Sequence, residues 1–258
     1  MVRTLTAALL LALVGMTVPA RTEDAAAHIA QAQQTLTEIA QLLDSVAARH
    51  AAPTRDPAAG RTAPEAGGWT SLFDGATLSG WRVTAFVGGG QAHVVKGFRG
   101  GPPAIVVDAG DALSGINWTK DAPRTNYEIT LEAMKIEGDD FICGLTFPVR
   151  DSHASLILGG WGGTVVGISS IDGLDASENE TTMTQQFPKD RWFAIRMRVT
   201  PEKLEAWLDE KKVVDESISG KKIGLRFGEI SKSVPIGLAT YRTTAAYRGI
   251  KLRLLDAK

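Results

Sequence analysis

Tyr127-Glu-Ile-Thr-Leu-Glu-Ala133 is the stretch that decides the fold. Its apolar residues occupy every second position and alternate with Glu128, Thr130 and Glu132. Successive side chains of a β-strand point to opposite faces of the sheet. The pattern therefore predicts a strand with one face in the core and the other in water.

The same alternation returns in the second half of the chain. Residues 193–199 alternate apolar residues with Arg196 and Arg198, and residues 250–254 repeat the pattern. Residues 203–215 are typical of two strands joined by a tight polar turn. About a dozen such segments, with almost no helical periodicity after residue 69, predict an all-β fold, an antiparallel β-sandwich over residues 69–256.

The N-terminus has the features of a secretory signal peptide over residues 1–20. Arg3 precedes an apolar run from Leu5 to Val14, and small residues lead up to Ala20. The run is too short to span a bilayer, so we expect no membrane span in the mature chain. This predicts a periplasmic or secreted protein. With Cys143 as its one cysteine, the chain has no intrachain disulfide and depends on its core for stability.

Residues 21–50 are predicted to form an N-terminal helix. Between residues 25 and 50, apolar residues are spaced alternately three and four apart, which suits a coiled-coil seam. Two interpretations stay open: a spacer helix, or a homo-oligomer formed through residues 25–50. Residues 51–68 are rich in Pro, Gly and Ala without periodicity, which is typical of a linker.

Composition excludes several functional classes. The chain has 258 residues, a formal net charge of −1 and a pI near 6.4, so no global basic field attracts nucleic acid. There is no Gly-x-Ser-x-Gly elbow, phosphate-binding loop, His-Glu-x-x-His or paired-cysteine zinc motif. Neutral partners are therefore expected.

Residues 143–182 contain the most distinctive chemistry. Trp161 lies in Gly159-Gly-Trp-Gly-Gly163, so its immediate neighbours have no side chains to cover the indole. An uncovered indole is a broad apolar platform for a sugar ring. The alternative is a core tryptophan whose glycines allow close packing. We expect Trp81, Trp192 and Trp207, which fall in strand-like runs, to lie in the core.

A cluster of acids and amides follows, composed of Asp172, Asp175, Glu178, Asn179 and Glu180. In an extended strand, Glu178 and Glu180 share a face, and their carboxyl groups can approach the separation found in retaining glycosidases. Oxygen ligands of this kind also suit Ca²⁺, although the EF-hand pattern is absent. A solvated acidic loop is the third interpretation.

Other polar residues are candidates for the same site. His153, beside Asp151, is a candidate base near neutral pH, with a structural role as the alternative. Arg242 has a fork of donors that suits a carbonyl or carboxylate, with a surface ion pair as the alternative. The same two interpretations apply to Arg248. Asp140, in the pair Asp139-Asp140, is expected in a turn or near a cation.

Trp69-Thr-Ser-Leu-Phe-Asp-Gly-Ala-Thr-Leu-Ser-Gly-Trp81 resembles the opening motif of the bacterial 3-keto-disaccharide hydrolase domain family. Residues 127–133, the 143–182 block and residues 236–252 fall where the later motifs of that family fall. The resemblance covers about residues 69–255 and implies a concanavalin A-like or laminin-G-like jelly roll with a carbohydrate-binding sheet. The chain departs from the family at residues 140–147, where many members carry Asn-Ser-Gly followed by arginine.

The resemblance implies cleavage of a glycoside whose C3 hydroxyl has been oxidised to a ketone. The ketone acidifies the C2 proton, so a base can remove it, the C1 substituent can leave, and water can then add. Glu178, Glu180 and His153 are the expected bases, and Arg242 or a cation would stabilise the enolate oxygen.

Two further interpretations stay open. In a non-catalytic carbohydrate-binding module, Trp161 would stack on the sugar, and Asp172, Asp175 and Asn179 would bind its hydroxyls. In an assembly protein, residues 25–50 would associate and the sandwich would be displayed.

Overall fold

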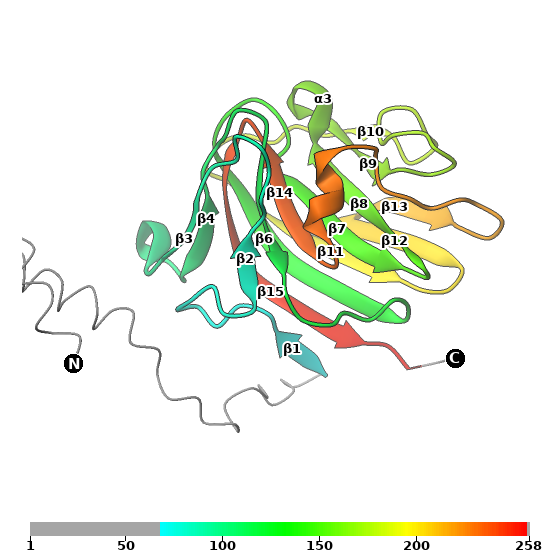
Figure 1. The fold of residues 1–258 in the computed structure, drawn as a ribbon, viewed down its shortest axis with the longest axis horizontal. Coiled ribbons are helices and arrows are strands. Elements are labelled where there is room, and N and C mark those ends of the chain that lie inside the picture. Colours follow the sequence, from blue (N-terminus) through cyan, green and yellow to red (C-terminus); the bar gives the residue numbers. More distant parts are fainter. Residues whose placement is uncertain (1–67, 257–258) are drawn as a thin grey trace, which may run out of the picture. The chain divides into compact units, whose positions relative to one another are not determined.

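Two antiparallel β-sheets packed face to face form the framework of residues 68–256, the part of the chain that the computed structural model describes (Figure 1). Sheet A has the order β13-β12-β11-β6-β15-β4-β3, with β1 added on β15, and sheet B has the order β10-β9-β8-β7-β14-β5-β2. The predicted antiparallel β-sandwich is therefore confirmed.

The elements have the following bounds. Sheet A contains β1 (Trp69–Ser71), β3 (Ala92–Val95), β4 (Ala104–Val107), β6 (Tyr127–Glu137), β11 (Trp192–Val199), β12 (Lys203–Leu208), β13 (Lys211–Ser217) and β15 (Thr244–Leu254). Sheet B contains β2 (Trp81–Val83), β5 (Leu113–Trp118), β7 (Cys143–Val149), β8 (Ser152–Gly159), β9 (Val165–Ser169), β10 (Met183–Thr184) and β14 (Gly237–Tyr241). Three short helical turns complete the fold: η2 (Phe98–Gly100), α3 (Gly160–Gly163) and η3 (Glu229–Ser233).

The predicted signal peptide (1–20), helical segment (21–50) and linker (51–68) lie outside the described residues, except for Gly68. Within residues 68–256, no helix is long and apolar enough to cross a membrane.

Alternating side chains build the core between the sheets. Tyr127, Ile129, Leu131 and Ala133 of β6 are at most 2% exposed, as their spacing predicts. The alternating residues of β7, β8, β11 and β12 pack against them in one cluster. Because each strand buries every second side chain there, its remaining side chains line the outer face of its sheet.

Two tyrosine hydroxyls connect the sheets across this core. Tyr127 of β6 donates to the Pro148 carbonyl (2.5 Å), and Tyr247 of β15 donates to the Ile142 carbonyl (2.6 Å). Burial raises the pKa of both phenols, so both stay protonated and act as donors. The acceptors lie near the two ends of β7, so these bonds fix β7 against sheet A.

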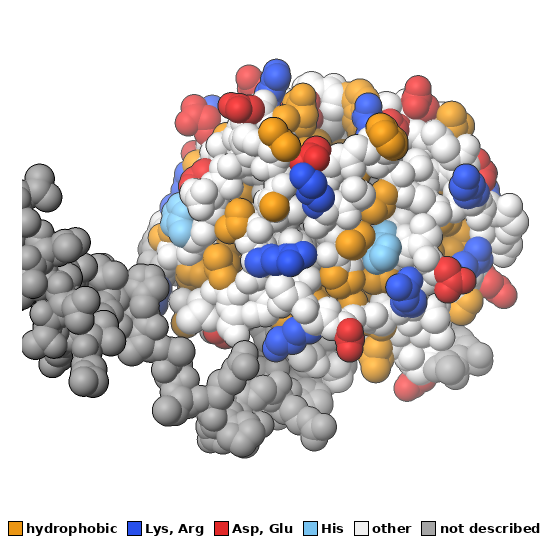
Figure 2. Space-filling view, in the orientation of Figure 1, with side chains coloured by type: hydrophobic (Ala, Val, Ile, Leu, Met, Phe, Trp, Pro, Cys, Tyr) orange, Lys and Arg blue, Asp and Glu red, His pale blue; other side chains and the backbone are white. Residues whose placement is uncertain are grey.

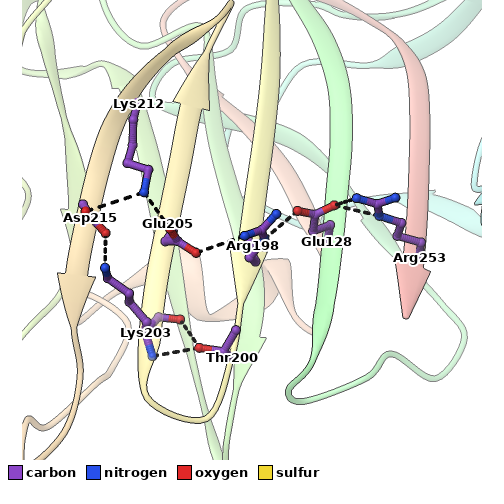
Figure 3. A network of polar contacts seen from close by, with 8 residues as sticks. All are labelled: Glu128, Arg198, Thr200, Lys203, Glu205, Lys212, Asp215 and Arg253. Atoms are coloured by element: carbon purple, nitrogen blue, oxygen red, sulfur yellow. Dashed lines mark hydrogen bonds and ion pairs between the residues drawn. The ribbon is translucent and has the colours of Figure 1, made fainter. Parts of the chain in front are cut away.

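A network of charges covers the outer face of sheet A (Figure 3). Glu128 has no exposed surface, although its alternation predicts a solvated side chain. Its two carboxylate oxygens accept bonds of 2.7 Å from Arg198 Nε and Arg253 Nε, which lie on neighbouring strands. Glu205 extends the network to Lys212, whose Nζ lies 2.7 Å from the Glu205 carboxylate. The arginine stems thus exclude water from a carboxylate on the outer face.

The tryptophans in strands divide between the core and this outer face. Trp81 is buried, as expected. Trp207 lies on the outer face of sheet A, with the Arg196 guanidinium 3.8 Å from its ring centroid, so the core prediction is wrong for it. Leu204, Ala206 and Leu208 are the inward residues of β12, and alternation places Trp207 opposite them. Trp192 is partly buried, 5.9 Å from Phe98 in a small cluster apart from the main core, and it points opposite the inward Phe193, so the core prediction is wrong for it as well.

The Glu128 network makes a prediction about stability. Among residues 68–256, Arg198→Met leaves the buried Glu128 carboxylate with Arg253 as its one remaining ion-pair partner. We expect a loss of about 2 kcal/mol in the free energy of unfolding, measured by urea denaturation. The matched control, Lys203→Met, removes an exposed pair with Asp215 on the same face and should cost less than about 1 kcal/mol. Equal losses in the two variants would show that burial of Glu128 has no energetic importance.

Candidate functional site

Small and polar side chains form a row across the outer face of sheet B. Successive cross-strand partners point to the same face. Along this row they are Arg82, Asn117, Gly237, Thr146, Ser155 and Ser169. Thr146 and Ser155 are hydrogen-bonded to each other at 2.9 Å. The middle of the outer face of sheet B is therefore polar, and its short side chains project little from the sheet.

Residues 225–235, which include η3, lie over this face (Figure 1). Ile230 packs in a small apolar cluster with Phe86 and Ala239. Asn117 Nδ2 donates to the Val234 carbonyl at 3.0 Å. A Cβ atom at Gly237 would lie 2.4 Å from the Ser233 carbonyl oxygen, so glycine at 237 permits this close approach. The segment forms one wall of a hollow.

This hollow, named the aromatic hollow here, has a volume of about 430 Å³. Its lining comes from the sheet B strands β5, β8, β9 and β14, from α3, from the segment before β7, and from η3 with the residues before it. The lining residues are Leu113, Asp140, Phe141, Ser155, Ile157, Trp161, Ser169, Arg226, Phe227, Glu229, Ile230 and Tyr241. Figure 2 shows that hydrophobic and basic side chains occupy the middle of the face in view, while acidic ones lie mostly nearer its edge.

Trp161 projects from the turn between β8 and β9. Its backbone is left-handed (φ 48°), and its side chain is 42% exposed. The Gly162 N–H donates to the Asp140 carboxylate at 3.0 Å, and a Cβ at Gly163 would lie 2.6 Å from the Asp139 carbonyl oxygen. The glycines thus allow close packing against residues 139–140, and the indole is open to the hollow as well.

Asp175 joins the floor of the hollow to its wall. One carboxylate oxygen accepts a bond of 2.9 Å from the Ser169 hydroxyl, and the other lies 3.1 Å from Arg226 Nη1. The Arg226 guanidinium carbon lies 5.7 Å from the Trp161 ring centroid. This places a positive group with several donors beside an exposed indole.

Further aromatic and acidic groups complete the hollow. Phe227 is fully exposed, and Tyr241 lies 6.0 Å from Phe141 between ring centroids. Glu229 accepts a bond from Lys232 Nζ at 2.7 Å and from the Val87 N–H at 3.0 Å. The Lys232 bond and then the backbone bond lower the pKa of Glu229, so this carboxylate is ionised and a weak base.

A second hollow lies on the same face, at the start of β8. It is named the basic hollow here, and its volume is about 520 Å³. His153 lines it, and Ser155 and Ile157, which line the aromatic hollow, are the next two outward positions of β8. Burial, and then the charge of Arg124, lower the pKa of His153, so its imidazole is neutral at pH 7.

The expected pair Glu178 and Glu180 does not converge with Trp161. Residues 172–182 form turns instead of the extended strand that the pair would need. Glu178 accepts the Asp175 N–H at 3.4 Å, and Glu180 is paired with Lys221. Neither residue lines the aromatic hollow, so the predicted geometry is wrong.

Asp172, Asn179 and Arg242, also expected in the site, bind the protein backbone. Asn179 is buried, and its amide donates to three carbonyls, which fixes the 168–179 loop. Asp172 accepts the Lys222 N–H at 2.7 Å. Arg242 Nε donates to the Asp111 carbonyl at 3.0 Å, and Arg242 lies beside Tyr241 without lining the hollow. Of the predicted binding residues, Trp161 lines the hollow and Asp175 supports it through Arg226.

Sequence reasoning missed Arg226, Phe227 and Tyr241. Arg226 and Phe227 stand in Gly224-Leu-Arg-Phe-Gly228, where a basic and an aromatic residue between glycines interrupt the strand pattern. That interruption was the available signal. Arg248, in contrast, forms an ion pair with Glu132 on sheet A.

The calcium expectation gains no support from the described part of the chain. Within residues 68–256, no group of three or more His, Cys, Asp or Glu side chains is placed to hold a metal ion.

The fold is a jelly-roll β-sandwich, and two hollows lie on the outer face of its sheet B. A family model described as "3-keto-alpha-glucoside-1,2-lyase-like domain" matches residues 68–253. The chain belongs to this family, as its resemblance to the 3-keto-disaccharide hydrolase domains predicts. No curated protein matches the chain.

Several solved structures are similar at low identity. The Crh5 transglycosylase is 13% identical, with 74% of this chain and 84% of that chain covered and a TM-score of 0.46. A protein with a galectin-like fold from Bacillus subtilis is 11% identical, with coverage of 69% and 92% and a TM-score of 0.45. The carbohydrate binding module CBM66 from the same species is 11% identical, with coverage of 67% and 95% and a TM-score of 0.40.

The basic hollow makes a prediction about protonation. In an NMR pH titration, we expect the pKa of His153 below its ordinary value of 6.5, and Arg124→Gln should raise it part of the way, because burial remains. The folded protein then takes up this proton less readily than the unfolded chain, so the contribution of His153 to stability falls as the pH drops below 6.5. A pKa of 6.5 or higher, or one insensitive to Arg124→Gln, would contradict this geometry.

Proposed function

We propose that this protein binds a 3-keto-glycoside in the aromatic hollow and cleaves it by elimination. The observation that carries the proposal is the exposed Trp161 indole beside the Arg226 guanidinium, in a hollow on one outer face of the sandwich. An indole offers an apolar face to the C–H groups of a sugar, and a guanidinium offers donors to its hydroxyl and carbonyl oxygens. The family assignment supplies the substrate class.

The reaction needs a base and a group that stabilises an oxyanion. Removal of the C2 proton by the base leaves negative charge on the C3 oxygen. The bond from C1 to the leaving oxygen then breaks, and this oxygen takes up the proton from the protonated base, so that the substituent departs as an alcohol. The product has a C1–C2 double bond conjugated to the ketone, and addition of water to it completes hydrolysis. A positioned base and a preorganised positive group each lower such a barrier.

Asp140 and Arg226 are the residues of the hollow that fit these roles. The Asp140 carboxylate accepts the N–H groups of Phe141 (2.8 Å) and Gly162 (3.0 Å), and this orients it next to Trp161. A carboxylate has further lone pairs to accept a proton. Arg226, held by Asp175, has the charge to stabilise the enolate oxygen.

A second candidate function is carbohydrate binding without cleavage. It is favoured by Glu229, whose carboxylate accepts bonds from Lys232 Nζ and the Val87 N–H. These bonds lower the pKa of Glu229 and weaken this carboxylate of the hollow as a base. In this function, the same hollow holds the sugar and no bond is broken.

Export and self-association complete the proposal. We propose cleavage after Ala20, release to the periplasm or the cell exterior, and association through residues 25–50, on the basis of the sequence patterns alone. N-terminal sequencing of the native protein and sedimentation with and without residues 21–68 test these points.

Turnover separates the two candidate functions. We expect the full chain to convert methyl 3-keto-α-glucoside into the conjugated enone, followed by its ultraviolet absorbance, and Asp140→Asn to slow this by about a hundredfold or more. Glu178→Gln and Glu180→Gln belong in the same experiment, because the sequence predicts these carboxylates as bases. If Glu178→Gln or Glu180→Gln lost turnover while Asp140→Asn stayed active, the base would be a residue outside the aromatic hollow. Binding without turnover in the wild type would support the second function.

Binding tests the role of Trp161 in either function. Trp161→Ala should weaken binding of the keto sugar by about tenfold in calorimetry, because the stacking platform is lost. The control, Leu254→Ala, removes another exposed hydrophobic side chain, on sheet A, and should leave the affinity unchanged. Equal affinity in wild type and Trp161→Ala would place the sugar elsewhere.

A further inference from the structure

The basic hollow carries uncompensated positive charge. Arg82, Lys120 and Arg124 line it, and Asp121 is the one acidic residue among its lining. Within residues 68–256, none of the three cations forms an ion pair with a carboxylate. Three positive groups facing one acid give this hollow a net attraction for anions.

The aromatic hollow differs in this respect. Its cation, Arg226, is paired with Asp175, and its Glu229 is paired with Lys232. The two hollows share one face of sheet B, but only the basic one has positive charge left over, whereas Asp140 of the aromatic hollow accepts backbone N–H groups. A ligand that distinguishes them must carry a negative group at the end near the start of β8.

One hydrogen bond orients each arginine of the basic hollow, and the other N–H donors of its guanidinium group remain available for a ligand. Arg82 Nε donates to Asn117 Oδ1 at 3.3 Å, and Arg124 Nη1 donates to the Arg150 carbonyl at 3.0 Å. The remaining guanidinium N–H groups of both have no partner among the described residues. Lys120 Nζ lies 5.4 Å from the Trp118 ring centroid. Such free forks suit a planar or tetrahedral oxyanion.

His153 adds a group that responds to an anion. Its half-buried imidazole lines the hollow with the three cations and is close enough to Arg124 to feel its charge. An anion bound there would offset these positive charges and favour the protonated imidazole. His153 is therefore an internal reporter of occupancy.

We propose that the basic hollow is a binding site for the carboxylate or sulfate group of an acidic saccharide. That the anion belongs to a saccharide rests on the proposed function of the neighbouring aromatic hollow. The anion site itself rests on Arg82, Lys120 and Arg124 alone.

The first arm of the test uses inorganic sulfate on the full chain. Millimolar sulfate should shift the imidazole NMR signals of His153 saturably and raise its pKa. The double variant Arg82→Gln/Arg124→Gln should weaken this binding by about tenfold or more, because two charge-assisted donors are lost. Arg191→Gln, which removes an exposed arginine just before β11, is the matched control and should bind sulfate as the wild type does.

The second arm compares methyl α-glucuronide with methyl α-glucoside. The glucuronide should shift the His153 signals and the neutral glucoside should not. Trp161→Ala should leave sulfate binding intact, so a failed sugar site and a failed anion site give different results. Sulfate binding with no response to the glucuronide would overturn the saccharide assignment.

The anion site is overturned if sulfate leaves the His153 signals unchanged, or if it shifts them equally in the wild type and the double variant. Unchanged thermal unfolding of the double variant is the check that its loss of binding is local, and Lys120→Gln provides an independent variant with the same expected direction.

Discussion

The Asp175 carboxylate is the group on which the candidate site depends. It accepts the Ser169 hydroxyl from the floor of sheet B and pairs with Arg226 from the segment that lies over that sheet. Without this bridge, the 225–235 segment would keep its apolar anchor at Ile230, but nothing in the described structure would hold the guanidinium beside Trp161. Asp175 therefore acts through Arg226 and positions the site.

The two outer faces of the sandwich are built for different purposes. On sheet A, long side chains close the surface, because arginines and lysines bind the carboxylates of Glu128, Glu132 and Glu205 and cover the ring of Trp207. On sheet B, short residues at Gly237, Thr146 and Ser155 keep the surface low. This face contains the aromatic hollow, and the segment bearing η3 forms one of its walls.

Alternation in the sequence was sufficient to predict the sandwich, because a period of two is a local property of a strand. A second local pattern identified Trp161, because its flanking glycines leave the indole uncovered. The prediction that Glu178 and Glu180 share one face was wrong, because it applied the two-residue period of a strand to a segment that forms turns. In turns, the direction of side chains has no fixed period. Arg226 and Tyr241 reach the hollow through strand order and loop packing, which no local pattern records. Glu128 is buried by arginines from β11 and β15, a long-range effect that its own strand does not show.

The central claim is that a sugar ring lies against Trp161 on the outer face of sheet B. The most direct measurement is an NMR titration of the indole N–H signals of the six tryptophans with methyl 3-keto-α-glucoside. We expect a saturable shift of the Trp161 signal, with the signals of Trp81 and Trp118 in the core unmoved. A saturable shift of any other indole with Trp161 unchanged, or no shift at all, would contradict it.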